Sequence, residues 1–237
     1  GDWSSDVCSS DLVSSPKDRL TTPPDQLLSS SVTPTALAGL VMGAALLPNS
    51  AISAMQGFVL KEFLKYASHR FGPRQVERVL EKVTLQSNCQ FACWKYVDPV
   101  ELTELLEGMV RQTGLERRDI LVGFGRQMFQ TLINMPLMQP VGDNLFDFME
   151  SVEPGFYQEL LDLFPDLELP RLTCTRIGSQ TMQVDYDSPR RLGDLAEGLI
   201  LAAIAHFPEE IALRRLDDQP EPGVIRFVLE RDNGEAE

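Results

Sequence analysis

The chain has 237 residues, which is enough for one large domain or two small ones. Hydrophobic residues make up 43% of the sequence, a fraction typical of globular proteins that excludes a wholly disordered chain. The formal net charge of −14 argues against binding to nucleic acid or to an anionic membrane, because both need a basic surface. The four cysteines are too few and too scattered for a disulfide framework, so a reducing, cytoplasmic setting fits best.

The N-terminal segment differs from the rest of the chain. Residues 1–12 (GDWSSDVCSSDL) resemble the conceptual translation of a sequencing-adapter oligonucleotide, and we expect them to be an artefact. Residues 13–54 are rich in Ser, Thr, Pro, Ala and Leu, and within them 35–54 is similar to a signal-peptide core and cleavage site. The apolar run is short for a membrane span. We favour a disordered or non-native leader with Met55 as the true start, because the globular patterning begins there.

Helical patterns fill the first part of the domain, which we expect to cover residues 55–232. Apolar stripes at helical spacing, with Pro and Gly at the ends, predict helices over 57–72, 73–83, 98–114, 115–135 and 144–164. Residues 87–97 are expected to form an irregular connector. Gly123 and Gly125 weaken the helix propensity of their segment, which indicates close approach by a neighbouring element. The dipeptide Pro154-Gly155 predicts an interruption in the last of these helices.

The pattern then changes from helices to strands. Residues 172–178 and 179–187 read as two strands of a hairpin that turns near Gly178-Ser179. A strongly apolar helix is expected over 191–207. Two further strands, over 210–218 and 223–232, follow it, and the tail at 233–237 is expected to be frayed. Helices followed by a β-β-α-β-β order predict an α+β fold with a four-stranded antiparallel sheet.

Three polar side chains at the end of the second strand form a candidate binding site. Since side chains alternate along an extended chain, Tyr186, Ser188 and Arg190 point to one side of the backbone. Pro189 holds Ser188 extended. A guanidinium offers a planar fork of donors that matches a carboxylate, and two hydroxyls add donors beside it. The trio therefore predicts a clamp for an anionic group on an apolar ligand. The alternative is that the trio is solvated or pairs with the protein's own carboxylates.

Catalytic and metal-binding patterns are weak. The sequence contains no nucleophile–base pair, no Ser-His-Asp set and no phosphate-binding glycine loop, so we do not expect an enzyme. Cys89 and Cys93 form a pair without a second pair, and the chain has only His69 and His206, so we expect no zinc site.

Longer segments resemble a known family. The start MQGFVLKEFL (55–64), the segment FGRQMF (124–129) and YDSPRRLGDLAEGLILAAIAHF (186–207) are similar to the heme-nitric oxide/oxygen binding (H-NOX) domain of bacteria. The last segment contains the family's Y-x-S-x-R motif, and the resemblance runs from Met55 to about Glu230. It implies a helical subdomain over a four-stranded antiparallel sheet with flanking helices, enclosing one heme b.

The resemblance also implies roles for individual residues. Tyr186, Ser188 and Arg190 would hold the heme propionates, and Pro170 would lie against the porphyrin. The pocket lining would include Val59, Phe63 and Leu199. Leu195 stands where oxygen-holding members carry a distal tyrosine, so an apolar distal pocket would favour nitric oxide or carbon monoxide. Residues 214–227 contain no Cys or His, unlike relatives with a C-terminal zinc site.

Tyr157 departs from the family pattern, because it stands where the family's iron-binding histidine is expected, thirteen residues before Pro170. Three interpretations remain. As a phenolate, Tyr157 is a candidate axial ligand of ferric iron. It could instead hydrogen-bond within a pocket that holds heme loosely or takes another carboxylated apolar ligand. It could also be a core tyrosine in a domain that has lost its cofactor.

The function that the resemblance implies is a non-catalytic heme-based sensor of nitric oxide or redox state. Such a domain would act on a signalling partner, for example a histidine kinase, a cyclic-di-nucleotide enzyme or a chemotaxis receptor. The alternative is a heme-free module that binds another carboxylated apolar ligand or serves only as a protein interaction domain.

Overall fold

The computed structural model describes residues 51–83, 85, 99–135, 142–163, 168–216 and 223–231. The sequence predictions for the adapter-like segment, for most of the leader, for the connector at 87–97 and for the tail at 233–237 lie outside these residues. The first described helix begins at Ala51, four residues before Met55.

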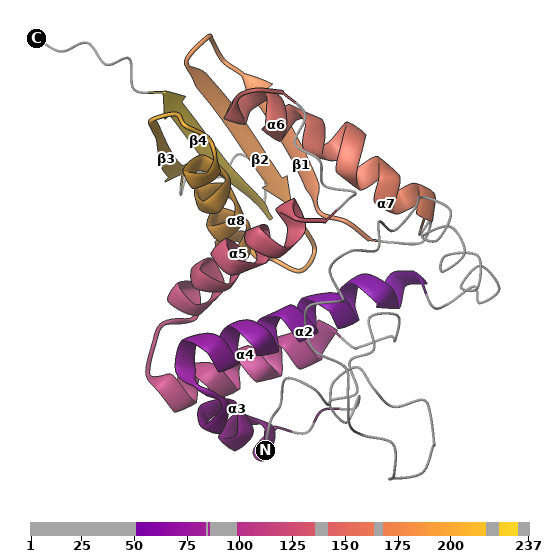
Figure 1. The fold of residues 1–237 in the computed structure, drawn as a ribbon, viewed down its shortest axis with the longest axis vertical. Helices are drawn as coiled ribbons and strands as arrows, with labels where there is room; N and C mark the ends of the chain where they lie inside the picture. The colour runs from indigo at the N-terminus through magenta and orange to yellow at the C-terminus, as the bar shows by residue number, and fades with distance from the viewer. Residues whose placement is uncertain are drawn as a thin grey trace, which may run out of the picture.

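Four helices form the lower part of the molecule in Figure 1, and their bounds are α2 (Ala51–Phe71), α3 (Pro73–Leu80), α4 (Pro99–Thr113) and α5 (Arg117–Ile133). The boundary between α2 and α3 follows the predicted stop signal. Gly72 adopts a φ of 90°, which is accessible to glycine at little cost, and Pro73 then occupies the first turn of α3. The chain therefore folds back at this point.

The next helical segment changes its winding part-way. It consists of α6 (Leu145–Ser151), a π-helix η2 (Val152–Tyr157) and α7 (Gln158–Leu163). Asn144 caps α6, and its side-chain oxygen accepts the backbone N–H of Asp147 at 3.1 Å. The interruption predicted at Pro154-Gly155 thus takes the form of a π-helix, because proline has no N–H to donate to the α-helical ladder.

The four strands form one antiparallel sheet with the order β1-β2-β4-β3. Their bounds are β1 (Arg171–Arg176), β2 (Thr181–Asp187), β3 (Ile211–Leu216) and β4 (Val224–Arg231). The alternation predicted for β2 is confirmed, since Met182, Val184 and Tyr186 are buried while the residues between them are less so. Helix α8 (Gly193–His206) connects β2 to β3 and packs on the sheet.

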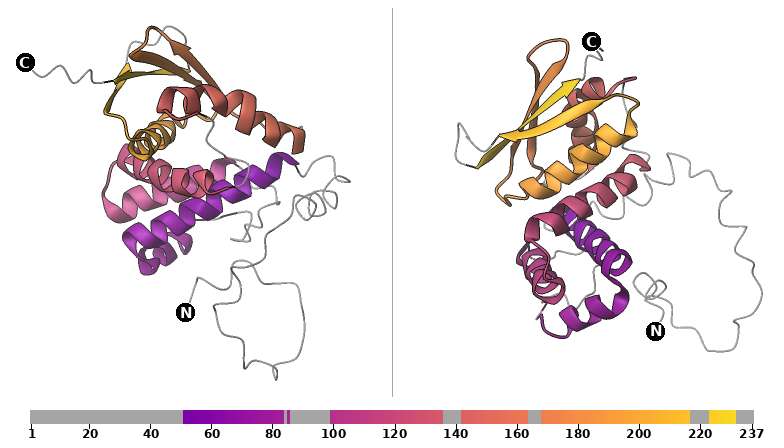
Figure 2. Two further views of the ribbon diagram at one scale, coloured as in Figure 1. Left: turned by 45° about the horizontal axis from the view of Figure 1, so that its top comes forward. Right: turned by 90° about the vertical axis from the view of Figure 1, so that its left-hand side faces the viewer.

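Helices α5 and α8 cross with their backbones in direct contact. An added Cβ at Gly198 would lie 2.2 Å from the carbonyl oxygen of Val122, and one at Gly125 would lie 2.3 Å from the carbonyl oxygen of Leu195. The close approach expected at Gly125 is therefore present, and at Gly123 the missing side chain makes room for the hydroxyl of Tyr66. Figure 2 (right) shows the resulting order of layers: the sheet, then α8, then α5, then α2, α3 and α4.

Ion pairs also link α8 to α5 and to β3. Arg215 of β3 donates to Asp194 at 2.6 Å and to Glu197 at 3.2 Å. Arg118, in the first turn of α5, also pairs with Glu197, whose side chain is buried. Because α5, α8 and β3 share these carboxylates, loss of one arginine would leave a buried charge partly unpaired.

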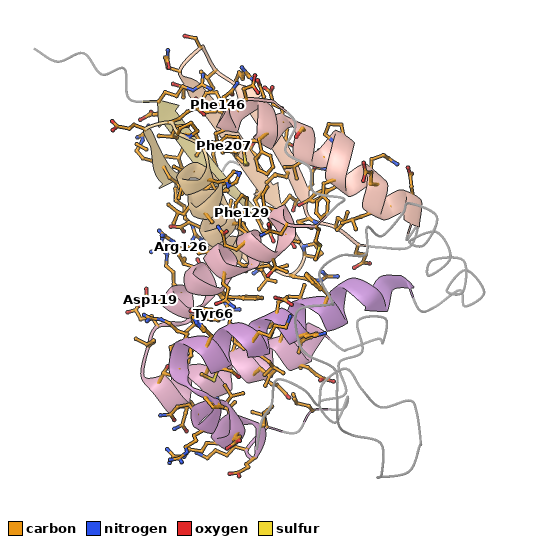
Figure 3. All side chains as sticks on the ribbon, viewed as in Figure 1. Tyr66, Asp119, Arg126, Phe129, Phe146 and Phe207 are labelled. Atoms are coloured by element: carbon orange, nitrogen blue, oxygen red, sulfur yellow. The ribbon has the colours of Figure 1, made fainter. Side chains whose placement is uncertain are left out.

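Two hydrophobic cores lie on either side of this crossing. One belongs to the helical part and includes Phe63, Tyr66 and Phe124, while the other lies under the sheet and includes Phe129 and Phe146. Figure 3 shows Tyr66 low in the molecule and Phe146 high in it, with Phe129 between them. Within the described residues, no helix is long and apolar enough to cross a membrane.

Candidate functional site

A cavity of about 420 Å³ lies between the two cores. Its walls come from α2, α4, α5, α6, η2, α8 and the two segments that flank the β1-β2 hairpin. The size falls within the range of small-molecule sites, and the lining is mostly apolar. The polar residues on the wall are Thr103, Tyr157, Glu168, Tyr186, Ser188 and Arg190.

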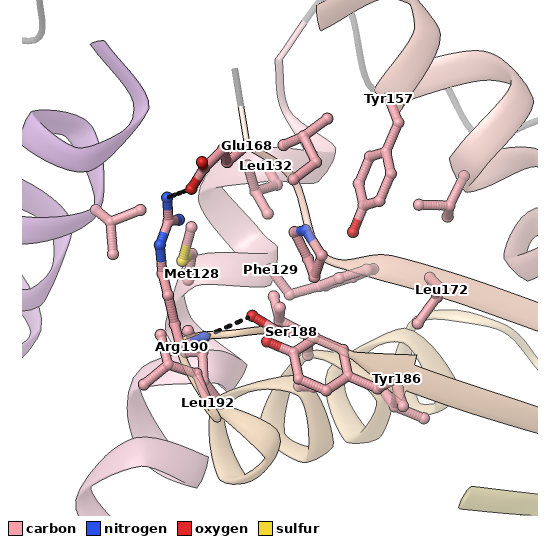
Figure 4. Close-up of a pocket in the computed structure, with 18 of the residues that line it drawn as sticks. Met128, Phe129, Leu132, Tyr157, Glu168, Leu172, Tyr186, Ser188, Arg190 and Leu192 are labelled. Atoms are coloured by element: carbon pink, nitrogen blue, oxygen red, sulfur yellow. Dashed lines mark hydrogen bonds and ion pairs between the residues drawn. The ribbon is translucent and has the colours of Figure 1, made fainter. Parts of the chain in front are cut away.

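The predicted trio lies together on this wall (Figure 4). Tyr186 is the last buried residue of β2, Ser188 is also buried, and the side chain of Arg190 is 28% exposed. The backbone differs from the expected extended chain, because β2 ends at Asp187 and residues 188–191 form a turn. In this turn the N–H of Arg191 donates to the carbonyl of Ser188 at 3.1 Å. Pro189 takes the second position of the turn, where its fixed φ is favourable.

The trio places three hydrogen-bond donors on the cavity wall. Burial raises the pKa of Tyr186, and the hydrogen bond with Ser188 and the charge of Arg190 oppose that rise only in part. Tyr186 therefore keeps its proton at neutral pH and can donate it. The backbone N–H of Arg190 donates to the hydroxyl oxygen of Ser188 at 3.3 Å, which fixes the turn. Two hydroxyls and one guanidinium in this arrangement suit a ligand carboxylate.

Arg190 also has a carboxylate from the protein itself. Its Nη2 lies 3.9 Å from Oε2 of Glu168, a residue on the cavity wall whose side chain is 70% exposed. The alternative considered for the trio, pairing with the protein's own acids, is thus partly realised. No periodic pattern in the sequence marks Glu168 as a site residue. The register of the hairpin, in which Arg171 pairs with Asp187, could have shown that residues 168–170 lie beside the trio.

Tyr157 lies on the same cavity wall, at the end of η2. Figure 4 shows its hydroxyl directed away from its own helix, toward the side of the cavity where Phe129 and Tyr186 lie. Burial is the largest cause of a strongly raised pKa for Tyr157, and the neighbouring Tyr186 and Glu153 raise it further. The group is therefore a neutral phenol at physiological pH and can act as a hydrogen-bond donor.

Glu153 anchors the helix that carries Tyr157. Its Oε1 accepts the backbone N–H of Leu172 at 2.5 Å, which links η2 to the first residues of β1. Glu153 also stands one position after the start of the π-helix. The placement of Tyr157 thus depends on both the winding of η2 and this contact with the sheet.

The structure places the other predicted residues as follows. Pro170, Val59, Leu195 and Leu199 all line the cavity. Phe63 is fully buried but is not among the lining residues; its ring packs edge-on against Phe124 at a centroid distance of 5.3 Å. Phe63 lies one helical turn further along α2 than Val59. It is therefore beyond the end of the cavity and belongs to the core of the helical part.

Neither histidine lies on the cavity. His69 and His206 are exposed, and the ring of His206 packs against Phe207 at 5.2 Å. Among the described residues there is no group of three or more His, Cys, Asp or Glu side chains that could hold a metal ion.

Comparison with known proteins now identifies the fold. The Haem-NO-binding family model matches residues 56–215, about two thirds of the chain. The chain belongs to this family. The family resemblance and the α+β fold class expected from the sequence are therefore confirmed. No curated protein matches the sequence significantly.

Solved H-NOX structures share the fold. The Fe(II) unliganded H-NOX protein from K. algicida is 18% identical, with a TM-score of 0.68 over 76% of this chain and 98% of that chain. The S. oneidensis H-NOX protein in the Fe(II)NO state is 19% identical, with a TM-score of 0.66 over 75% of this chain and 99% of that one. The H-NOX from Shewanella woodyi, bound to IWP-051 in the Fe(II)CO state, is 25% identical, with a TM-score of 0.66 over 77% and 97%.

Proposed function

We propose that this H-NOX domain is a non-catalytic sensor whose cavity binds heme b and responds to nitric oxide or to redox state. It would pass this response to a signalling partner such as a histidine kinase, a cyclic-di-nucleotide enzyme or a chemotaxis receptor. The observation that carries the proposal is the position of Tyr186, Ser188 and Arg190 on the wall of an apolar cavity. Membership of the Haem-NO-binding family supports the choice of ligand.

The carboxylate side of the cavity fits heme. Heme is flat and apolar and carries two propionates, and the cavity pairs apolar walls with one guanidinium and two hydroxyls. Arg190, Ser188 and Tyr186 would hold the propionates. Pro170 lines the cavity just before β1, where it would lie against the ring.

The iron side fits less well, because Tyr157 must lose its proton to become a ligand. Burial disfavours the phenolate, and the neighbouring groups that act on Tyr157 raise its pKa further. The charge of ferric iron is the factor that would reverse this, and tyrosine ligation of heme is an established arrangement. We therefore expect heme to be held in the ferric state more firmly than in the ferrous state.

The bound group would supply an iron centre able to take a diatomic ligand. Val59, Leu195 and Leu199 contribute only apolar side chains to the wall. They offer no hydrogen bond to bound dioxygen, so in the ferrous state we expect nitric oxide or carbon monoxide to be favoured.

Hemin loading tests the proposal. The wild-type protein is expected to keep a Soret band after desalting. Arg190→Met should weaken hemin binding about tenfold, at the lower end of the range for a charge-assisted hydrogen bond because the side chain is partly exposed. Arg191→Met is the matched control, since Arg191 is exposed and does not line the cavity. A wild-type protein without a Soret band would refute heme as the ligand.

A second variant tests the iron ligand. Tyr157→Phe removes only the hydroxyl, so it should shift the ferric Soret band and weaken hemin retention if the phenolate is a ligand. An unchanged spectrum would show that Tyr157 does not bind the iron, even in a protein that keeps hemin.

The raised pKa of Tyr157 favours a second candidate function, a heme-free module for another carboxylated apolar ligand. A neutral phenol would donate a hydrogen bond to such a ligand, while the trio would hold its carboxylate. Mass spectrometry of small molecules extracted from the purified protein distinguishes the two candidates. Recovery of heme alone would rule out the second.

A further inference from the structure

The sheet register places an acidic residue against the trio. β1 pairs with β2 in antiparallel register, with Arg171 opposite Asp187. The segment that enters β1 and the turn that leaves β2 therefore lie side by side. Glu168 stands on the first of these and Arg190 on the second, and their side chains approach to 3.9 Å.

These two residues carry the only full charges on the cavity wall among the described residues. The other lining side chains are apolar or neutral, so Glu168 and Arg190 balance each other when no ligand is bound. Figure 4 shows the carboxylate of Glu168 at the guanidinium of Arg190, on the side away from Ser188 and Tyr186. A carboxylate ligand that reaches Arg190 must therefore share it with Glu168.

We propose that Glu168 makes the cavity favour ligands with fewer carboxylates, because it holds Arg190 in the ligand-free cavity and repels each ligand carboxylate that comes near. The inference rests on the proposed function, since it concerns the same cavity. A ligand with one carboxylate exchanges one anion for another at Arg190. With two carboxylates, three anions surround a single guanidinium, so the repulsion by Glu168 grows with the charge of the ligand.

Iron-free porphyrins test this inference without involving Tyr157 as a metal ligand. Protoporphyrin IX, its monomethyl ester and its dimethyl ester carry two, one and no carboxylates on the same ring. Their Kd values can be measured by porphyrin fluorescence for wild type, for Glu168→Gln and for the control Glu159→Gln. Glu159 is an exposed residue of α7 that does not line the cavity.

We expect Glu168→Gln to lower the Kd about twofold to fivefold for each ligand carboxylate, the scale of a partly exposed ion pair. The Kd of the dimethyl ester should stay within about twofold of wild type. In 1 M salt the effect should shrink, because the Debye length falls to about 3 Å. Glu159→Gln should leave all three values unchanged.

Two results would overturn the inference. In the first, Glu168→Gln lowers the Kd of all three porphyrins equally, which would indicate a change in cavity shape. In the second, it lowers the Kd of none of them. If wild type binds the porphyrins in either case, the proposed function stands while the role of Glu168 fails. If neither wild type nor the variant binds any porphyrin, the inference fails, and the hemin test decides the proposed function separately.

Discussion

Replacing Gly198 with alanine is expected to destabilise the domain, because the new methyl group would point into the backbone of α5. Its Cβ would lie 2.2 Å from the carbonyl oxygen of Val122 and 3.0 Å from Cα of Gly125. Ordinary contact distances are about 3.5–4.0 Å, so the two helices would have to separate by about 1 Å. Neither contact atom belongs to a side chain that could move aside. Overpacking of this kind costs about 1–3 kcal/mol.

Thermal unfolding followed by circular dichroism measures this cost. For a domain of this size, 1 kcal/mol corresponds to about 2–4 °C, so Gly198→Ala should lower Tm by roughly 2–12 °C. Gly155→Ala is the matched control, because Gly155 is also helical and a Cβ there would meet no atom within 4 Å. It should leave Tm unchanged or raise it, since alanine favours a helix by about 1 kcal/mol over glycine. A Gly198→Ala protein with the same Tm as the wild type would refute the packing argument.

Three further predictions concern other parts of the molecule. The hydrogen bonds from Arg226 lower the pKa of Asp185, so the ionised carboxylate stabilises the folded protein. This stabilisation is fully present above about pH 4, the pKa of Asp in the unfolded chain, and is lost as the pH falls through the pKa of the folded state. Asp185→Asn should cost up to about 1 kcal/mol in urea unfolding at pH 7, and this difference should vanish toward pH 2. Gly123→Ala should destabilise the domain, because the added Cβ would lie 2.2 Å from the hydroxyl of Tyr66. Tyr66→Phe removes that hydroxyl and should restore part of the lost stability in the double variant. A double-mutant cycle in which the two effects simply add would contradict this. Burial raises the pKa of the Cys174 thiol to about 12, so its iodoacetamide labelling at pH 8, read from its own peptide by mass spectrometry, should be slow until the protein unfolds.

The parts of the fold that depend on local pattern could be predicted from the sequence. The alternation of apolar residues along β2 gave the buried face of the strand, and Gly72-Pro73 gave the break between α2 and α3. Gly125 was expected to permit close approach, but its partner, Gly198 of α8, lies 73 positions away, and no local pattern connects the two. The crossing of α5 and α8 is therefore a tertiary property.

In the candidate site, too, local pattern predicted some features and tertiary structure determines the others. Tyr186, Ser188 and Arg190 reach one wall as their spacing predicted, although a turn rather than an extended chain brings Arg190 there. Phe63 shares a helical stripe with Val59, yet it lies beyond the cavity, because a stripe gives the direction of a side chain and not its depth along the helix. The proximity of Glu168 to Arg190 could not be predicted from local pattern, because it arises from the pairing of β1 with β2.

The π-helix at Val152–Tyr157 sets the direction in which the residues after it point. A π-turn accommodates one more residue than the α-helical turn it replaces. Rewinding this turn as an α-helix would rotate the residues that follow it by about 100° relative to α6, the angle of one residue in an α-helix. Tyr157 stands at the last position of the turn and would change the direction of its hydroxyl. Such a rewinding would change which group of η2 faces the cavity.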